Sequence, residues 1–132
     1  MINDDYILIV DDNKGIRTLL EEFLKSENYK VKTASNGIEA LHLIRQTLPS
    51  VVLLDFKMPV MSGLEVLKVI DTVWTTLPVI IISAYTKNGK LFQDGLVRYF
   101  LTKPFDLKSL GEMLRTIIEN INNTDKTGPL SG

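Results

Sequence analysis

Five strand-like runs alternate along the chain with longer segments of helical periodicity, and this alternation restricts the fold more than any other feature. The runs are residues 6–10, 30–33, 51–54, 78–82 and 99–101. Two of them, VVLL at 51–54 and PVIII at 78–82, are apolar throughout. Such a strand is typically buried on both faces, as in a parallel sheet that helices cover on both sides. The sequence therefore predicts an α/β fold of the (βα)5 type, doubly wound around a five-stranded parallel sheet.

Helix signals stand between the runs. Apolar residues recur at i, i+3, i+4, i+7 and i+8 from Ile16 to Leu24, and Asn28 is the expected stop of that helix. Capping pairs are expected at Asn36 with Glu39 and at Ser62 with Glu65, and a cap at Asp106. The helix that Asp106 begins is expected to end at Ile121. Residues 86–95 have little periodicity, and we expect only a short helix around Lys90.

Length and composition limit the domain count and the function classes. The chain has 132 residues, which indicates one domain, and we place it at residues 4–121. Residues 122–132 are polar and glycine-rich, so we expect a disordered tail and no room for an effector domain. The net charge of −1 argues against a nucleic-acid or anionic-membrane binder. The absence of cysteine excludes disulfides, thiolate zinc sites and cysteine nucleophiles.

Polar residues stand where the predicted strands end. The residues are Asp11 and Asp12, Asp55, Ser83 and Lys103. Carboxyl ends of parallel strands share one edge of the sheet, where such folds bind ligands. Each residue alone has an ordinary alternative, since Asp11 or Asp12 could cap the first helix, Asp55 could be a turn acid, Ser83 a small loop residue and Lys103 a solvated charge. Together they predict a functional site.

The chemistry of this set favours phosphoryl transfer. Two carboxylates at about 4 Å repel by roughly 4 kcal/mol at most, and a divalent cation removes this penalty. Oxygen ligands without histidine or cysteine favour Mg²⁺, with Mn²⁺ as the alternative ion. A carboxylate can act as a nucleophile and become an aspartyl phosphate, while a lysine and a hydroxyl bind the remaining phosphoryl oxygens.

Four motifs resemble the receiver domain of bacterial two-component response regulators, in the same order and spacing. They are ILIVDDN (7–13), VVLLDFKMP (51–59), IIISAY (80–85) and LTKPF (101–105). The resemblance covers roughly residues 4–121. It implies the flavodoxin-like receiver fold with strand order 2-1-3-4-5.

The resemblance also implies a role for each site residue. Asp55 would be the phosphoacceptor, Asp12 a direct Mg²⁺ ligand, and Asp11 a ligand acting mostly through water on the metal. Asp55 itself and the backbone carbonyl of Lys57 would complete the metal set. Ser83 and Lys103 would bind the phosphoryl group, with the Lys103–Pro104 bond cis. Ser83 and Phe100 would form the conformational switch, and because Phe100 lacks a hydroxyl, it would act by packing alone.

Further details resemble the stand-alone receivers of sporulation phosphorelays in spore-forming bacilli. The segments are DDNKGIR (11–17), LLDFKMP (53–59), SAY (83–85) and KPFD (103–106). This implies a cytoplasmic, monomeric protein that takes phosphoryl from a sensor histidine kinase and passes it to a histidine phosphotransferase. An aspartyl-phosphate phosphatase is a further expected partner. Partners would dock on Gly15, Ile16, Met58, Tyr85, Pro104 and Phe105, unless these are merely well-packed loop residues.

Other functions stay open at this point. A stand-alone receiver could instead bind a target protein directly, as chemotaxis-type receivers do. A phosphatase with Asp55 as nucleophile usually carries a second acid two residues later, where this chain has Lys57. A flavin-binding module would need a Ser/Thr/Gly-rich phosphate loop after the first strand, where this chain has DDNKG. We therefore expect no turnover enzyme, but a protein that catalyses its own Mg²⁺-dependent phosphorylation and dephosphorylation.

Overall fold

From the first strand to the fourth, the strands and helices alternate as predicted. The computed structural model describes residues 5–58, 60–84 and 99–131, with side chains as far as residue 122. In chain order the elements are β1 (Ile7–Val10), α1 (Lys14–Ser26), β2 (Val31–Ala34), α2 (Gly37–Gln46), β3 (Val51–Asp55), α3 (Gly63–Val73), β4 (Val79–Ser83), β5 (Tyr99–Thr102) and α5 (Leu107–Ser131). The helix expected around Lys90 lies outside the described residues.

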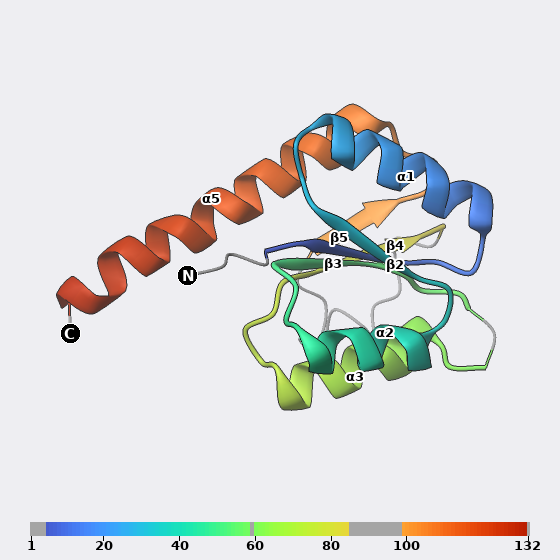
Figure 1. Cartoon of the computed structure of the whole chain (residues 1–132), viewed down its shortest axis with the longest axis horizontal. Coiled ribbons are helices and arrows are strands. Elements are labelled where there is room, and N and C mark those ends of the chain that lie inside the picture. The colour runs from blue at the N-terminus through green and yellow to red at the C-terminus, as the bar shows by residue number, and fades with distance from the viewer. Residues whose placement is uncertain (1–4, 59, 85–98, 132) are drawn as a thin grey trace.

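All strand pairs are parallel, and the five strands are ordered β2-β1-β3-β4-β5. This confirms the predicted fold class. Figure 1 shows α1 and α5 over one face of the sheet, and α2 and α3 over the other. A parallel sheet covered in this way has two separate apolar layers, one beneath each pair of helices.

The central strand β3 supplies both layers. Val51 and Leu53 pack in the cluster beneath α1 and α5, while Val52 and Leu54 pack in the cluster beneath α2 and α3. All four side chains are completely buried. Because successive side chains of a strand point to opposite faces, a strand in this position must be apolar at every residue. The run VVLL is therefore explained by its central place in the sheet.

The helix caps also follow the sequence. Ser62 and Glu65 form the complete capping box of α3, and the Asn36 side chain accepts a hydrogen bond from the Glu39 backbone N–H at 2.8 Å. Asn28 has a φ of 73°, the left-handed conformation that asparagine tolerates better than most residues just after a helix. Over the described residues, no helix is both long and apolar enough to cross a membrane.

The end of α5 differs from the prediction. The chain beyond Ile121 was expected to be disordered, but the helix continues to Ser131 and its last turns project beyond the sheet (Figure 1). Adding a residue to an existing helix costs far less than starting one, because each added residue gains one backbone hydrogen bond. The polar sequence after Ile121 therefore does not mark the end of the helix.

Candidate functional site

The register of the sheet brings the predicted site residues to one edge. Val10, the last residue of β1, pairs with Leu54 of β3, so Asp11 just after β1 lies beside Asp55 at the end of β3. Ser83 of β4 pairs with Thr102 of β5, and Lys103 comes next. Five residues that the sequence scatters between positions 11 and 103 therefore meet at the carboxyl ends of four adjacent strands.

The acids form a compact cluster. Asp11, Asp12 and Asp55 each offer a carboxylate oxygen within 4.8 Å of the other two. Asp11 is 2% exposed and Asp55 is 5% exposed, while Asp12 is exposed. Burial at this edge removes water that would otherwise screen the negative charges. Three carboxylates this close form a donor set that fits a hard divalent cation such as Mg²⁺.

The electrostatics of Asp11 reflect this crowding. Burial raises the pKa of the Asp11 carboxyl above its usual value, and the charges of Asp55 and Asp12 raise this pKa further. The hydrogen bond from the Asn13 backbone N–H, at 2.9 Å, and the charge of Lys103 lower it in part. The site therefore destabilises the negative charge on Asp11, and a bound cation would relieve this.

Asn13, which the sequence reasoning missed, caps α1. Its side-chain oxygen accepts a hydrogen bond from the Ile16 backbone N–H at 3.0 Å. The alternative in which Asp11 or Asp12 caps this helix is therefore wrong, and both acids are left to the cluster. The available signal was an asparagine, a favoured capping residue, directly before the first helical turn.

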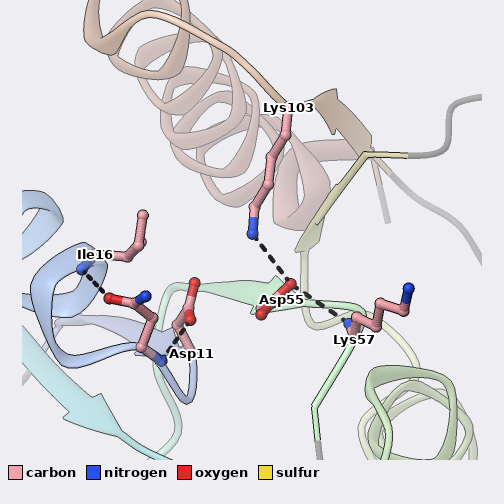
Figure 2. Close-up of polar contacts among 6 residues, drawn as sticks. Asp11, Ile16, Asp55, Lys57 and Lys103 are labelled. Carbon is pink, nitrogen blue, oxygen red and sulfur yellow. Dashed lines mark hydrogen bonds and ion pairs between the residues drawn. The ribbon is translucent and has the colours of Figure 1, made fainter.

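Lys103 reaches the cluster from the other side, and Ser83 is bonded to Lys103 through the backbone. The Nζ of Lys103 lies 3.5 Å from the Oδ1 of Asp55, and the Lys57 backbone N–H points to the same oxygen at 3.4 Å (Figure 2). The backbone N–H of Lys103 donates to the carbonyl of Ser83 at 2.7 Å, which ties these two residues together. Ser83 is itself buried, and the Lys103–Pro104 peptide bond is cis as expected.

Gly63 is a second residue that the sequence reasoning missed. A Cβ atom at this first residue of α3 would lie 2.7 Å from the Asp55 carbonyl oxygen and 2.6 Å from the Phe56 Cα. Both are backbone atoms, so a larger residue could be accommodated only if the backbone next to Asp55 moved. The glycine thus lets α3 pack directly against the segment that carries Asp55. Sequence position alone gave no sign of this close approach.

The proposed switch and docking residues occupy different surroundings. Phe100 is half-buried against the cluster beneath α2 and α3, and its switching role stays a prediction. Gly15 and Pro104 are exposed, and Ile16 and Phe105 are half-buried. Met58 is only 9% exposed and packs in the core, so for this residue the packed-loop alternative holds. Tyr85 lies outside the described residues.

Three of the expected docking residues line an apolar groove of about 480 Å³ beside the site. Ile16 and Leu19 of α1 form one wall, and Pro104 and Phe105 form the other. Lys103 also lines this groove, and it is the residue whose Nζ lies 3.5 Å from Asp55. A partner seated in the groove would therefore lie next to the acid cluster.

This chain is similar to known proteins in sequence and in fold. Residues 7–115 match the family described as the response regulator receiver domain. Sporulation initiation phosphotransferase F of Bacillus subtilis is 37% identical over 118 residues, which cover 87% of the chain and 94% of that protein. Response regulator TrrA of Thermotoga maritima, solved in complex with Mg²⁺ and BeF, is 34% identical with a TM-score of 0.78, covering 86% of the chain and 98% of that structure. Chemotaxis protein CheY4 of Vibrio cholerae is 28% identical with a TM-score of 0.79, at the same coverage.

Proposed function

Because this chain belongs to the receiver-domain family of response regulators, we propose that it accepts a phosphoryl group on Asp55 from a sensor histidine kinase and relays it to a histidine phosphotransferase. The observation that carries the proposal is the surroundings of Asp55. Its carboxylate lies within 4.8 Å of the two other acids and 3.5 Å from the ammonium group of Lys103. The similarity to sporulation initiation phosphotransferase F supports the relay.

In the proposed reaction an Asp55 carboxylate oxygen attacks the phosphorus of a phosphohistidine. The new O–P bond forms as the N–P bond breaks, and the donor histidine keeps the electron pair of that bond. Lys103 pairs with an oxygen of the transferred group, and the Ser83 hydroxyl binds another. These residues act mainly by positioning and by neutralising charge, which is what phosphoryl transfer requires. The return transfer to a phosphotransferase histidine is the same step in reverse.

We propose that Asp11, Asp12, Asp55 and the backbone carbonyl of Lys57 hold Mg²⁺. The three clustered carboxylates fit this ion because they are hard oxygen ligands and their mutual repulsion needs a cation. The ion would neutralise part of the negative charge that accumulates when a phosphoryl group approaches Asp55. The complex of TrrA with Mg²⁺ and BeF supports this assignment.

The partner surface in this proposal is the groove between α1 and the segment after β5. An apolar helix face of a phosphotransferase suits a groove walled by Ile16, Leu19 and Phe105. Lys57 is exposed two residues after Asp55, and in this proposal its side chain would face an incoming partner. A histidine kinase partner also implies a cytoplasmic protein. An aspartyl-phosphate phosphatase would act on the same accessible site.

In a second candidate function, Asp55 is phosphorylated in the same way, but the phosphorylated protein acts by binding a target protein. The likeness to chemotaxis protein CheY4 of Vibrio cholerae favours a receiver that binds a target directly when Asp55 is modified. The two candidates differ in one measurable property. A relay protein transfers phosphoryl onward to a histidine, whereas a target-binding receiver holds it until hydrolysis.

The test is labelling followed by transfer. The full chain is incubated with acetyl phosphate and Mg²⁺, and the intact mass is measured. We expect at most one added phosphoryl group per chain, because the protein is a stoichiometric acceptor and not a turnover enzyme. Asp55→Asn should abolish the label, while Glu119→Gln, which changes an exposed acid of α5, should keep it. The labelled protein is then mixed with a purified histidine phosphotransferase.

Appearance of phosphohistidine on the second protein supports the relay. A label on the wild type without any transfer, together with capture of a flagellar target, favours the direct-binding candidate. A chain that takes up no phosphoryl group, or whose label survives Asp55→Asn, contradicts both candidates.

A further inference from the structure

The acid-bearing loop after β1 is held from the side by an arginine of α1. The Nη1 of Arg17 donates a hydrogen bond to the backbone carbonyl of Asp11 at 2.8 Å. This carbonyl belongs to the peptide group that joins Asp11 to Asp12. Because a peptide group is planar, holding its oxygen sets the orientation of the whole unit and thereby the direction from which Asp12 leaves the strand.

Other hydrogen bonds hold the rest of this loop. The Asp11 N–H donates to the Ala34 carbonyl of β2 at 3.1 Å, and the Asn13 N–H donates to the Asp11 carboxylate at 2.9 Å. The Arg17 N–H donates to the Asn13 carbonyl at 3.0 Å. Arg17 thus contacts both ends of the loop, through its backbone at Asn13 and through its guanidinium at Asp11.

The guanidinium of Arg17 bonds to the backbone of the loop. An arginine usually pairs with a carboxylate, often through two parallel hydrogen bonds. Here, among the described residues, the guanidinium hydrogen bond goes to the backbone carbonyl of Asp11 instead. The half-buried guanidinium is therefore used for position.

This arrangement opposes the tendency of the cluster to spread. Asp12 is exposed, and repulsion by Asp11 and Asp55 would push its carboxylate into solvent. We propose that Arg17 is a positioning residue that holds the Asp11–Asp12 peptide so that both carboxylates stay at cation-binding distance from Asp55. The inference rests on the proposed function, since the cation it serves is the Mg²⁺ of that reaction.

The test compares Mg²⁺ binding in four full-length proteins: the wild type, Arg17→Gln, Arg17→Lys and Lys14→Gln. Gln is too short to reach the Asp11 carbonyl, whereas Lys can still donate one hydrogen bond. Lys14 is an exposed cation in the same helical turn, so Lys14→Gln removes an equal charge without touching the carbonyl. Two readouts are followed against Mg²⁺ concentration: the rise in urea unfolding midpoint, and the extent of labelling by acetyl phosphate.

We expect Arg17→Gln to need about ten-fold more Mg²⁺ than the wild type in both readouts, as happens when groups that orient metal ligands are removed. Arg17→Lys should lie between the two, and Lys14→Gln should follow the wild type. If Arg17→Gln is too unstable to measure, Arg17→Lys alone decides, by requiring more Mg²⁺ than Lys14→Gln.

Two results would overturn the inference while leaving the proposed function intact. In the first, the wild type responds to Mg²⁺ and Arg17→Gln requires the same Mg²⁺ concentration as the wild type. In the second, Lys14→Gln needs as much additional Mg²⁺ as Arg17→Gln. The loss would then be explained by the change in net charge and not by the hydrogen bond to the Asp11 carbonyl. A wild type that shows neither a Mg²⁺-dependent midpoint nor labelling overturns the proposed function, and this inference with it.

Discussion

Asp12 is the exposed member of the three carboxylates that the sheet edge holds together. A surface acid on a loop normally costs the fold nothing, because water screens its charge. Here the nearest neighbours are two other carboxylates, and both are buried. The geometry that suits a cation is therefore a source of instability whenever the cation is absent.

Asp12→Ala should stabilise the protein in EDTA. Removing one of the repelling charges should raise the free energy of unfolding by roughly 0.5–1 kcal/mol, a modest value because the side chain is exposed. Urea unfolding measured in EDTA and again in Mg²⁺ checks this, with Glu22→Ala on the exposed face of α1 as the control. Mg²⁺ should stabilise the wild type and the control but not Asp12→Ala. A mutant clearly less stable than the wild type in EDTA would show that the clustered acids do not repel as described.

The helices that flank the site begin at side-chain caps, and Asp106 caps α5. The Ser109 backbone N–H donates to the Asp106 carboxylate at 2.7 Å. Hydrogen bonds from the Ser109 side chain and backbone lower the pKa of the Asp106 carboxyl below its usual value. The charge also lies at the positive end of the helix dipole. The start of α5 follows directly on the segment 103–105 that lines the groove.

This cap should contribute to acid sensitivity. Because the pKa of Asp106 is lowered in the folded protein, its contribution is complete above the ordinary pKa of aspartate and is lost as pH falls through the folded value. Asp106→Asn keeps the cap and removes the titration. We expect the stability advantage of the wild type over Asp106→Asn to be constant near neutral pH and to shrink on acidification below about pH 4.

Urea unfolding between pH 3 and pH 7 measures this difference in EDTA. Asp106→Ala, which loses the cap at every pH, serves as the reference for the capping hydrogen bond. If the free energy of unfolding changes with pH equally in the wild type and Asp106→Asn, the Asp106 charge does not contribute to stability as described.

At the scale of the whole molecule, the groove exists only because α1 and the segment after β5 lie side by side over one face of the sheet (Figure 1). Leu19 contributes an apolar side chain that is 51% exposed, and Pro104 and Phe105 contribute from the other end of the chain. The same packing places Lys103 between the groove and Asp55. In the proposed function, the surface that binds a partner would therefore lie next to the phosphoacceptor, although the residues of the two are far apart in sequence.

Leu19→Ala should therefore separate docking from chemistry. We expect labelling by acetyl phosphate to stay at the wild-type rate, because a small donor does not need the groove. Transfer to a histidine phosphotransferase should slow by about ten-fold, the effect of losing a contact worth roughly 1–2 kcal/mol. Rapid-quench measurement of both steps checks this. Val73→Ala on α3, 57% exposed over the opposite face of the sheet, is the matched control and should transfer normally.

The sequence by itself determined which residues form the strands and which class of fold they build. It also singled out the five polar residues at the ends of the strands. It could do so because burial of a strand on both faces requires an apolar residue at each position, and VVLL and PVIII meet this requirement. Parallel strands also place all their carboxyl ends at one edge. The residues after each strand, Asp11, Asp55 and Lys103 among them, had to converge once the strands were known.

Only the tertiary structure decided which neighbours these residues would have. The hydrogen bond from Arg17 to the Asp11 carbonyl, the close approach of Gly63 to Asp55 and the burial of Met58 depend on how helices settle against the sheet. A periodic pattern reports which face of an element is buried, but not which atom it meets across the interface. The extension of α5 past Ile121 was also not predicted, because backbone hydrogen bonding can continue a helix into a polar sequence.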